Sequence, residues 1–247
     1  MRPFIIAEAG VNHNGSMNNA AALIAWAKWA GADAVKFQHY DAGEQVQRYT
    51  DSGEINDDLE SALYDCEFSI DQMVTLKQIA DGVGIEFMCT PFNAIKAREL
   101  DDAKLLKRFK IGSGQIAEIG MIDMISESGL PTILSLGRTN DEWTARALGS
   151  LLTVEVTLLY CISKYPTPDI DVKLREISKL ETQWGKPVGF SDHTIGIWAS
   201  VAAAMAGACV IEKHFTTDRG LAGPDHKCSL EPAEFKHMVD QIRAMVP

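Results

Sequence analysis

The sequence predicts a (β/α)8 barrel, or TIM barrel, that forms one domain over residues 1–247. Short apolar runs rich in β-branched and aromatic residues alternate along the chain with longer amphipathic stretches. This alternation occurs eight times in 247 residues, which is the usual size of such a barrel. The rival architecture is an open doubly wound sheet. Its nucleotide-binding glycine fingerprint is missing after the first strand.

Each predicted strand is followed by a connection to the next. The strands are expected over 4–10, 34–38, 86–91, 108–113, 131–137, 156–162, 187–193 and 210–215. Helical patterns occupy, for example, 21–32, 71–84, 121–129, 172–185, 197–207 and 232–245. Strands that are apolar on both faces and separated by helices imply a parallel sheet. The one long connection, residues 39–69, is acidic and polar, and we expect a partly ordered lid or substrate loop there.

Composition excludes several classes of protein. The chain is 46% hydrophobic, which is too apolar for a disordered protein. Its formal charge of −11 argues against nucleic acid or an anionic membrane as a partner. No apolar run approaches the roughly 18 residues of a membrane span. The five cysteines lack CxxC spacing, so we expect a reduced, cytoplasmic protein without a disulfide framework.

Polar residues recur at the carboxyl ends of the predicted strands, which is where barrel active sites are built. They are Glu8, Lys36, Gln38, Thr90, Lys110, Ser113, Ser135, Ser163, Tyr165, Ser191, Asp192, His193, Glu212 and His214. Lys36 and Lys110 stand in apolar strands, so each needs an anion, a carboxylate partner or a lowered pKa. With Thr90, Ser113, Ser135 and Ser191 they form a predicted ring of donors for a phosphate.

Two histidines indicate a metal site. His193 and His214 end adjacent strands about 4.8 Å apart, so their rings can converge on one divalent ion. Asp192 and Glu212 stand beside them as candidate supporting residues. The remaining histidines, His13, His39, His226 and His237, receive no role. His39 and His226 are expected in loops, and His237 on an exposed helix.

Residues 112–117, GSGQIA, match the spacing of a dinucleotide-binding loop. The match lies in the fourth repeat, and no carboxylate follows about 20 residues later. The glycines are better explained by the close approach of a phosphate to the backbone.

With these residues placed, the sequence resembles the sialic acid synthase family, the phosphoenolpyruvate-condensing enzymes that make N-acetylneuraminate and related nonulosonates. The resemblance is carried by nine blocks in order, IAEAGVNHNGS, AVKFQ, CTPF, FKIGSGQ, ILSLG, YCISKYPTP, GFSDHTIG, IEKHFTTDR and GPDHKCSL. Nine ordered blocks are far more specific than any one of them.

The resemblance implies a role for most of these side chains. Mn²⁺ or Mg²⁺ would be held by His193 and His214. Phosphoenolpyruvate would be held by Lys36, Thr90, Lys110, Ser113, Ser135, Tyr165 and Ser191. Glu8 and Asp225 would handle the amino sugar, N-acetylmannosamine or a related aldose, or water. Gln38, Gln115 and Ser163 would also contact substrate.

The chain departs from the family pattern at several positions. Gln115 stands where the family usually has Glu, Ser135-Leu136-Gly137 where Ser-Thr-Gly is usual, and Ser163 where Asn is common. The 247 residues include no counterpart of the family's C-terminal antifreeze-like domain. We expect a homodimer, with a separate antifreeze-like protein as a further candidate partner.

Two other functions stay open. A Schiff-base aldolase would use Lys110 or Lys36 as a nucleophilic amine. A catalytically impaired barrel that only binds phosphate and sugar is suggested by Gln115 and by the missing domain.

Overall fold

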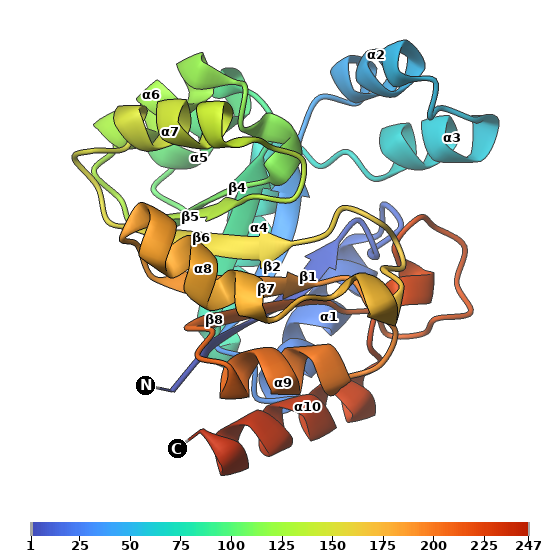
Figure 1. Ribbon diagram of the computed structural model, residues 1–247. Coiled ribbons are helices and arrows are strands. Elements are labelled where there is room, and N and C mark those ends of the chain that lie inside the picture. The colour runs from blue at the N-terminus through green and yellow to red at the C-terminus, as the bar shows by residue number, and fades with distance from the viewer. Residues whose placement is uncertain (1, 247) are drawn as a thin grey trace.

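The computed structural model, which describes residues 2–246, contains one eight-stranded sheet in the order β3-β2-β1-β8-β7-β6-β5-β4. The strands are β1 (Phe4–Gly10), β2 (Ala34–His39), β3 (Glu86–Pro91), β4 (Phe109–Ile111), β5 (Thr132–Ser135), β6 (Val156–Cys161), β7 (Val188–Asp192) and β8 (Val210–His214). Neighbours in this order pair in parallel. Because β3 and β4 also lie in contact, the sheet is nearly closed (Figure 1). The predicted TIM barrel is confirmed.

Helices surround the barrel (Figure 1). They are α1 (Met17–Trp29), α2 (Ala42–Ser52), α3 (Asp57–Asp65), α4 (Ile70–Val83), α5 (Ala94–Asp102), α6 (Ile119–Glu127), α7 (Asp141–Ser150), α8 (Arg175–Trp184), α9 (Trp198–Met205) and α10 (Pro232–Met245). Short 3-10 turns are η1 (Ser113–Gln115), η2 (Asp169–Asp171) and η3 (His226–Cys228). Ser, Asp or Asn side chains accept the first free amides of α1 to α5 and of α7, as helix N-caps do.

The connection over 39–69 is a correction to the sequence interpretation. It contains α2 and α3, which project beyond the barrel (Figure 1), and it is not mainly a loop. Two residues of α2, Ala42 and Gln45, are buried, and α3 buries none. The segment therefore lacks the regular apolar spacing by which a packed helix is recognised. Its caps, Asp41 and Asn56, were the available signal.

The barrel interior is built in layers because alternate residues of a strand face the same side. An apolar layer consists of Ile6, Ala34, Met88, Ile133, Leu159 and Val210. Gly189 belongs to the same level, where a Cβ atom would lie 2.5 Å from the Val210 carbonyl oxygen. Two residues further along the strands, the chain places Glu8, Lys36, Thr90, Ser135, Cys161, Ser191 and Glu212, all buried. The strand period therefore stacks a polar layer directly on an apolar one.

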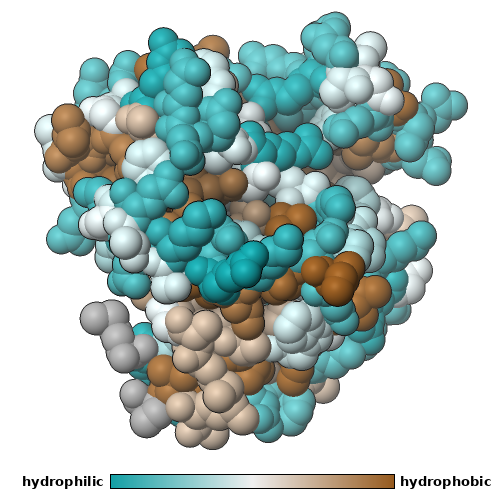
Figure 2. All heavy atoms as spheres, viewed as in Figure 1, coloured by the Kyte–Doolittle hydropathy of each residue, from teal (hydrophilic) through white to brown (hydrophobic). Residues whose placement is uncertain are grey.

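The surface is mostly polar, and it is hollowed on one side of the barrel (Figure 2). A cleft of about 800 Å³ lies between α3 and the segment that follows β8, and its lining includes Asp58, Asp65, Gly223 and Lys227. Across residues 2–246, no helix has both the length and the apolar character needed to cross a bilayer.

Candidate active site

Lys36 on β2 lies at the centre of the polar layer. Its Nζ atom is 2.8 Å from Glu8 Oε2 and 3.4 Å from Glu212 Oε2, and it donates a 2.9 Å hydrogen bond to Thr90 Oγ1. Burial alone would lower the pKa of Lys36, but the two carboxylates outweigh it, so the pKa lies above its ordinary value. Lys36 is therefore a permanent cation.

Lys110 on β4 lies in a different electrostatic environment. Its Nζ atom donates a 2.8 Å hydrogen bond to Ser135 Oγ and lies 3.6 Å from Glu212 Oε1. Burial lowers the pKa of Lys110, and its one carboxylate partner, Glu212, does not offset this effect, to which the positive charge of Lys36 adds. Burial would raise the pKa of Glu212, but Lys110 and Lys36 hold it down at about 2.

Hydroxyl groups complete the layer. Ser191 Oγ donates a 2.8 Å hydrogen bond to Glu212 Oε1. Ser113 and Ser163 share a 3.2 Å hydrogen bond, and a Cβ atom at Gly137 would lie 2.5 Å from Ser163 Oγ. The structure thus brings the lysines together with most of the predicted hydroxyls. Such a set of ammonium and hydroxyl donors suits a small anion.

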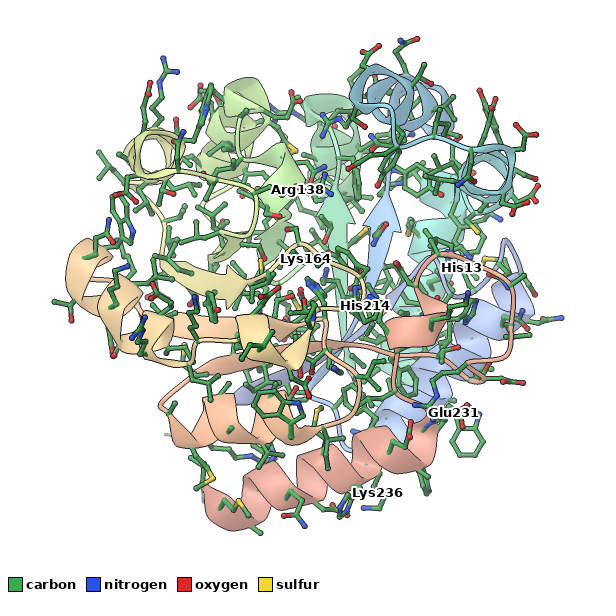
Figure 3. The ribbon with its side chains drawn as sticks, turned by 45° about the vertical axis from the view of Figure 1, so that its right-hand side comes forward. His13, Arg138, Lys164, His214, Glu231 and Lys236 are labelled. Carbon is green, nitrogen blue, oxygen red and sulfur yellow. The ribbon has the colours of Figure 1, made fainter. Side chains whose placement is uncertain are left out.

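The histidine pair lies at the open end of the layer. The ring centroids of His193 and His214 are 5.4 Å apart, and the Tyr165 ring is 4.1 Å from that of His193. Figure 3 shows His214 near the middle of the molecule. The predicted convergence of the two imidazoles is therefore present in the fold.

The two rings fit a divalent metal ion. Burial first, and His214 second, lower the pKa of His193 to about 3, so this ring is neutral. Its Nδ1–H donates a 2.8 Å hydrogen bond to the Ile162 carbonyl oxygen, which leaves the Nε2 lone pair available, as is common for metal ligands. The buried His214 Nδ1 atom has no hydrogen-bond partner. Within the described residues, no group of three His, Cys, Asp or Glu side chains could hold a metal, so a metal here would take its other ligands from water or substrate.

A second group of polar side chains gathers around Gly10, whose φ is +51°. A Cβ atom on this residue would lie 3.3 Å from Glu8 Oε1, from Gln38 Nε2 and from Asp225 Oδ2. Gln38 Nε2 donates a 3.1 Å hydrogen bond to Glu8 Oε1, and Asp225 Oδ2 is 3.6 Å from His214 Nδ1. Asp225, predicted from the resemblance alone, therefore belongs to the same mouth.

Gln115 lies in η1 and is buried, with 5% of its surface exposed. Its Oε1 atom occupies the space into which a side chain at Gly112 would project. A larger residue at position 112 would therefore displace the end of the Gln115 side chain.

Two expectations about side chains were wrong. Asp192 does not support the histidines, because it faces the helices, where its Oδ2 atom is 3.2 Å from Lys213 Nζ and accepts a hydrogen bond from Ser200. His39 had been expected in a loop, but it is the last residue of β2 and is buried against Glu99. His226 lies, as expected, in the connection between β8 and α10, where it is fully buried in η3.

The sequence interpretation also undervalued Glu212. It was expected beside the histidines, yet it lies between the two lysines and is held by Ser191. The alternation along β8, with Val210, Glu212 and His214 two residues apart, was the signal that could have located it.

Comparison with known proteins identifies the family of this chain. The sequence profile of the NeuB family matches residues 23–246. An N,N'-diacetyllegionaminic acid synthase of Legionella pneumophila is 40% identical over 257 residues, which cover 98% of this chain and 72% of the relative. The N-acetylneuraminate-9-phosphate synthase of Homo sapiens is 33% identical over 249 residues, which cover 97% of this chain and 69% of the relative.

A solved structure indicates the same family. The N-acetylneuraminic acid synthetase of Leptospira borgpetersenii, crystallised with citrate, superimposes with a TM-score of 0.90 at 33% identity and covers 99% of this chain and 84% of its own. A truncated 3-deoxy-D-arabino-heptulosonate 7-phosphate synthase of Thermotoga maritima, 13% identical with a TM-score of 0.74, shares the fold alone. The chain is therefore an enzyme of the NeuB family.

Proposed function

We propose that this chain condenses phosphoenolpyruvate with the open-chain aldehyde of an N-acetylated amino sugar, giving a nonulosonic acid and phosphate. The observation that carries the proposal is one mouth that holds both a donor layer for an anion and, beside it, the imidazoles of His193 and His214. The names of the relatives, synthases of N,N'-diacetyllegionaminic acid and of N-acetylneuraminate 9-phosphate, support this class of product.

In the proposed reaction, C3 of phosphoenolpyruvate forms a bond with the aldehyde carbon of the sugar. Water adds at C2, and the phosphate group then leaves with its bridging oxygen. Lys36 and Lys110, with Thr90 and Ser135, bind the acidic groups of phosphoenolpyruvate. Glu8 is aligned by Lys36 and Gln38, so its carboxylate can orient water or a sugar hydroxyl.

His193 and His214 are the residues that would hold a divalent metal, Mn²⁺ or Mg²⁺. When bound, such an ion polarises a carbonyl oxygen. His214→Ala is expected to remove bound metal and to leave the fold intact, because a residue at the carboxyl end of a strand lies outside the packed barrel layers. Elemental analysis measures the metal content, and His237→Ala on the exposed face of α10 is the control. A full metal complement in the His214 variant would refute this assignment.

The acceptor sugar is the finer part of the proposal. Relatives named N,N'-diacetyllegionaminic acid synthase match at 39–40% identity and those named N-acetylneuraminate-9-phosphate synthase at 32–33%. We propose an unphosphorylated, N-acetylated aldose, either N-acetylmannosamine or its diacetylated analogue. Gln115 supports a difference from the usual acceptor contact, because an amide can donate a hydrogen bond that a carboxylate cannot.

A Schiff-base aldolase is the second candidate, and the lowered pKa of Lys110 is the observation that favours it. Lys36, with its raised pKa, does not suit that role. Borohydride added during turnover should trap a substrate adduct on Lys110 only if the aldolase mechanism operates.

The decisive assay measures phosphate release from phosphoenolpyruvate with a panel of N-acetylated sugars, with added Mn²⁺ or with a chelator. We expect release that depends on both sugar and metal and that borohydride does not inhibit. Tight binding of phosphoenolpyruvate without phosphate release from any sugar would support the impaired barrel instead.

A further inference from the structure

The segment between β8 and α10, residues 215–231, carries Asp225 to the barrel mouth. Its outer side borders the cleft of about 800 Å³ that separates it from α3, as Figure 2 shows for this side of the molecule. Contacts that hold it in place come from the loop after β1. Two sets of hydrogen bonds make this connection: the one from Asn12 is buried, and the one from Asn14 reaches from the protein surface to the buried His226 ring.

The first set begins at Asn12, which is 1% exposed. Its Nδ2 atom donates 2.9 Å hydrogen bonds to the Phe215 carbonyl oxygen and to Ser229 Oγ. Ser229 Oγ in turn donates a 2.7 Å hydrogen bond to the carbonyl oxygen of Asp225. The backbone of Asp225 is thereby tied to the loop that follows Glu8 and Gly10.

The second set is centred on His226, the neighbour of Asp225, which is fully buried. The side chain of Asn14 donates through Nδ2 to the Ala222 carbonyl oxygen at 2.9 Å, so its Oδ1 atom is turned toward His226 Nε2 at 3.2 Å. His226 Nε2 therefore carries the proton. On the other side, Nδ1 lies 2.8 Å from Thr216 Oγ1. Because burial lowers the pKa of His226, the ring is neutral and Nδ1 is an acceptor. The Thr216 hydroxyl can donate to Nδ1 or to the Asp218 carbonyl oxygen at 3.1 Å, and Nδ1 is the nearer of the two.

The carboxylate of Asp225 has no hydrogen bond of its own to any described residue. Its Oδ2 atom nevertheless lies 3.6 Å from His214 Nδ1 and close to Glu8 across Gly10. With no hydrogen bond to orient it, the position of the carboxylate depends on the backbone of Asp225. That backbone is held by Ser229 on one side and by His226 on the other.

We propose that His226, fixed by Asn14 and Thr216, is a positioning residue that sets the place of Asp225 for the condensation, an inference that rests on the function proposed above. His226 does not touch substrate in this account. It acts by holding one carboxylate within about 1 Å of its working position, and misplacement on that scale can cost about 100-fold in rate.

The test is a double-mutant cycle on kcat. His226→Phe keeps a planar ring and removes both hydrogen bonds, and it is compared with Asp225→Asn and with the double variant. Each kcat is calculated per phosphoenolpyruvate-binding site, with the concentration of sites measured by calorimetry. A variant that is partly unfolded therefore does not appear slower for that reason alone. We expect His226→Phe to lower kcat by about 10-fold or more while the affinity for phosphoenolpyruvate changes less than about twofold. In the Asp225→Asn background the same change should cost less than about twofold.

Two further variants keep the result interpretable. Thr216→Val is nearly isosteric and takes the place of His226→Phe in the cycle if that protein does not fold. His237→Phe, on the exposed face of α10, should leave kcat unchanged. The positioning role would be overturned if His226→Phe lowered kcat by the same factor in the wild-type and Asp225→Asn backgrounds. It would also be overturned if His226→Phe left kcat undiminished. A wild-type protein that turns over no sugar would instead refute the proposed function.

Discussion

At the scale of single residues, the two buried lysines differ in ways that the sequence could only partly predict. Placement in apolar strands correctly required that each have an anion, a carboxylate or a lowered pKa. Lys36 has two carboxylate partners, whereas Lys110 has one and a lowered pKa. Which carboxylate meets which lysine depends on how the sheet closes, since Glu212 is 102 residues from Lys110 along the chain. Local pattern carries no information on that pairing.

Lys110→Met tests the anion layer at this scale. Loss of a buried cation that contacts phosphate should weaken binding of phosphoenolpyruvate by about 10-fold or more, which corresponds to about 1.4 kcal/mol. Calorimetry measures the dissociation constant. Lys236→Met is the matched control, because Lys236 lies on α10 away from the mouth (Figure 3). Equal affinities for the wild type and the Lys110 variant would mean that the anion binds elsewhere.

At the scale of elements, the two-residue period of the strands predicted the structure better than the apolar pattern of the helices did. Residues two apart on β1, β2 and β8 place Glu8, Lys36 and Glu212 in one layer, as the predicted strand ends required. The helices α2 and α3 were missed because they pack few apolar residues. A sequence reveals a helix through the face it buries, so a helix that buries little is found only through its caps.

The connection from β7 to α9, which carries His193, depends on a buried ion pair. Lys213 and Asp192 are both fully buried with their charged atoms 3.2 Å apart, and Asp192 also accepts hydrogen bonds from Thr194 and Ser200. Lys213→Met would leave the buried Asp192 carboxylate without its cation, which should lower the free energy of unfolding by about 3–5 kcal/mol. Lys236→Met breaks an exposed pair with Asp240 and should cost about 0.5 kcal/mol or less.

Urea denaturation of these two variants separates the buried pair from the exposed one. A loss in the Lys213 variant no greater than in the Lys236 variant would show that the Asp192 network does not fix this connection.

At the scale of the whole molecule, stability should depend on pH through buried neutral histidines. Burial lowers the pKa of His13 to about 4 from 6.5, and its ring stacks on Phe68 with centroids 4.1 Å apart. In the unfolded chain His13 binds a proton below about pH 6.5, whereas in the folded protein it binds that proton only below about pH 4. The contribution of His13 is therefore complete above pH 6.5 and is lost as the pH falls toward 4.

The expected size of this effect is about 2 kcal/mol less stability at pH 5 than at pH 7 from His13 alone. His13→Phe should remove that part of the pH dependence, and His237→Phe should leave the dependence as it is in the wild type. Urea titrations at the two pH values measure both. A His13 variant with the wild-type pH dependence would show that this ring is not held neutral.

The central claim is that the barrel mouth joins C3 of phosphoenolpyruvate to a sugar aldehyde. The most direct measurement is ¹³C NMR of a reaction that contains phosphoenolpyruvate labelled at C3, an N-acetylated aldose, Mn²⁺ and the enzyme. We predict that the label moves from a vinyl carbon to a methylene carbon bonded to the former aldehyde carbon, with one phosphate released per bond formed. Label that stays in phosphoenolpyruvate, or that appears as the methyl group of pyruvate, would contradict the claim.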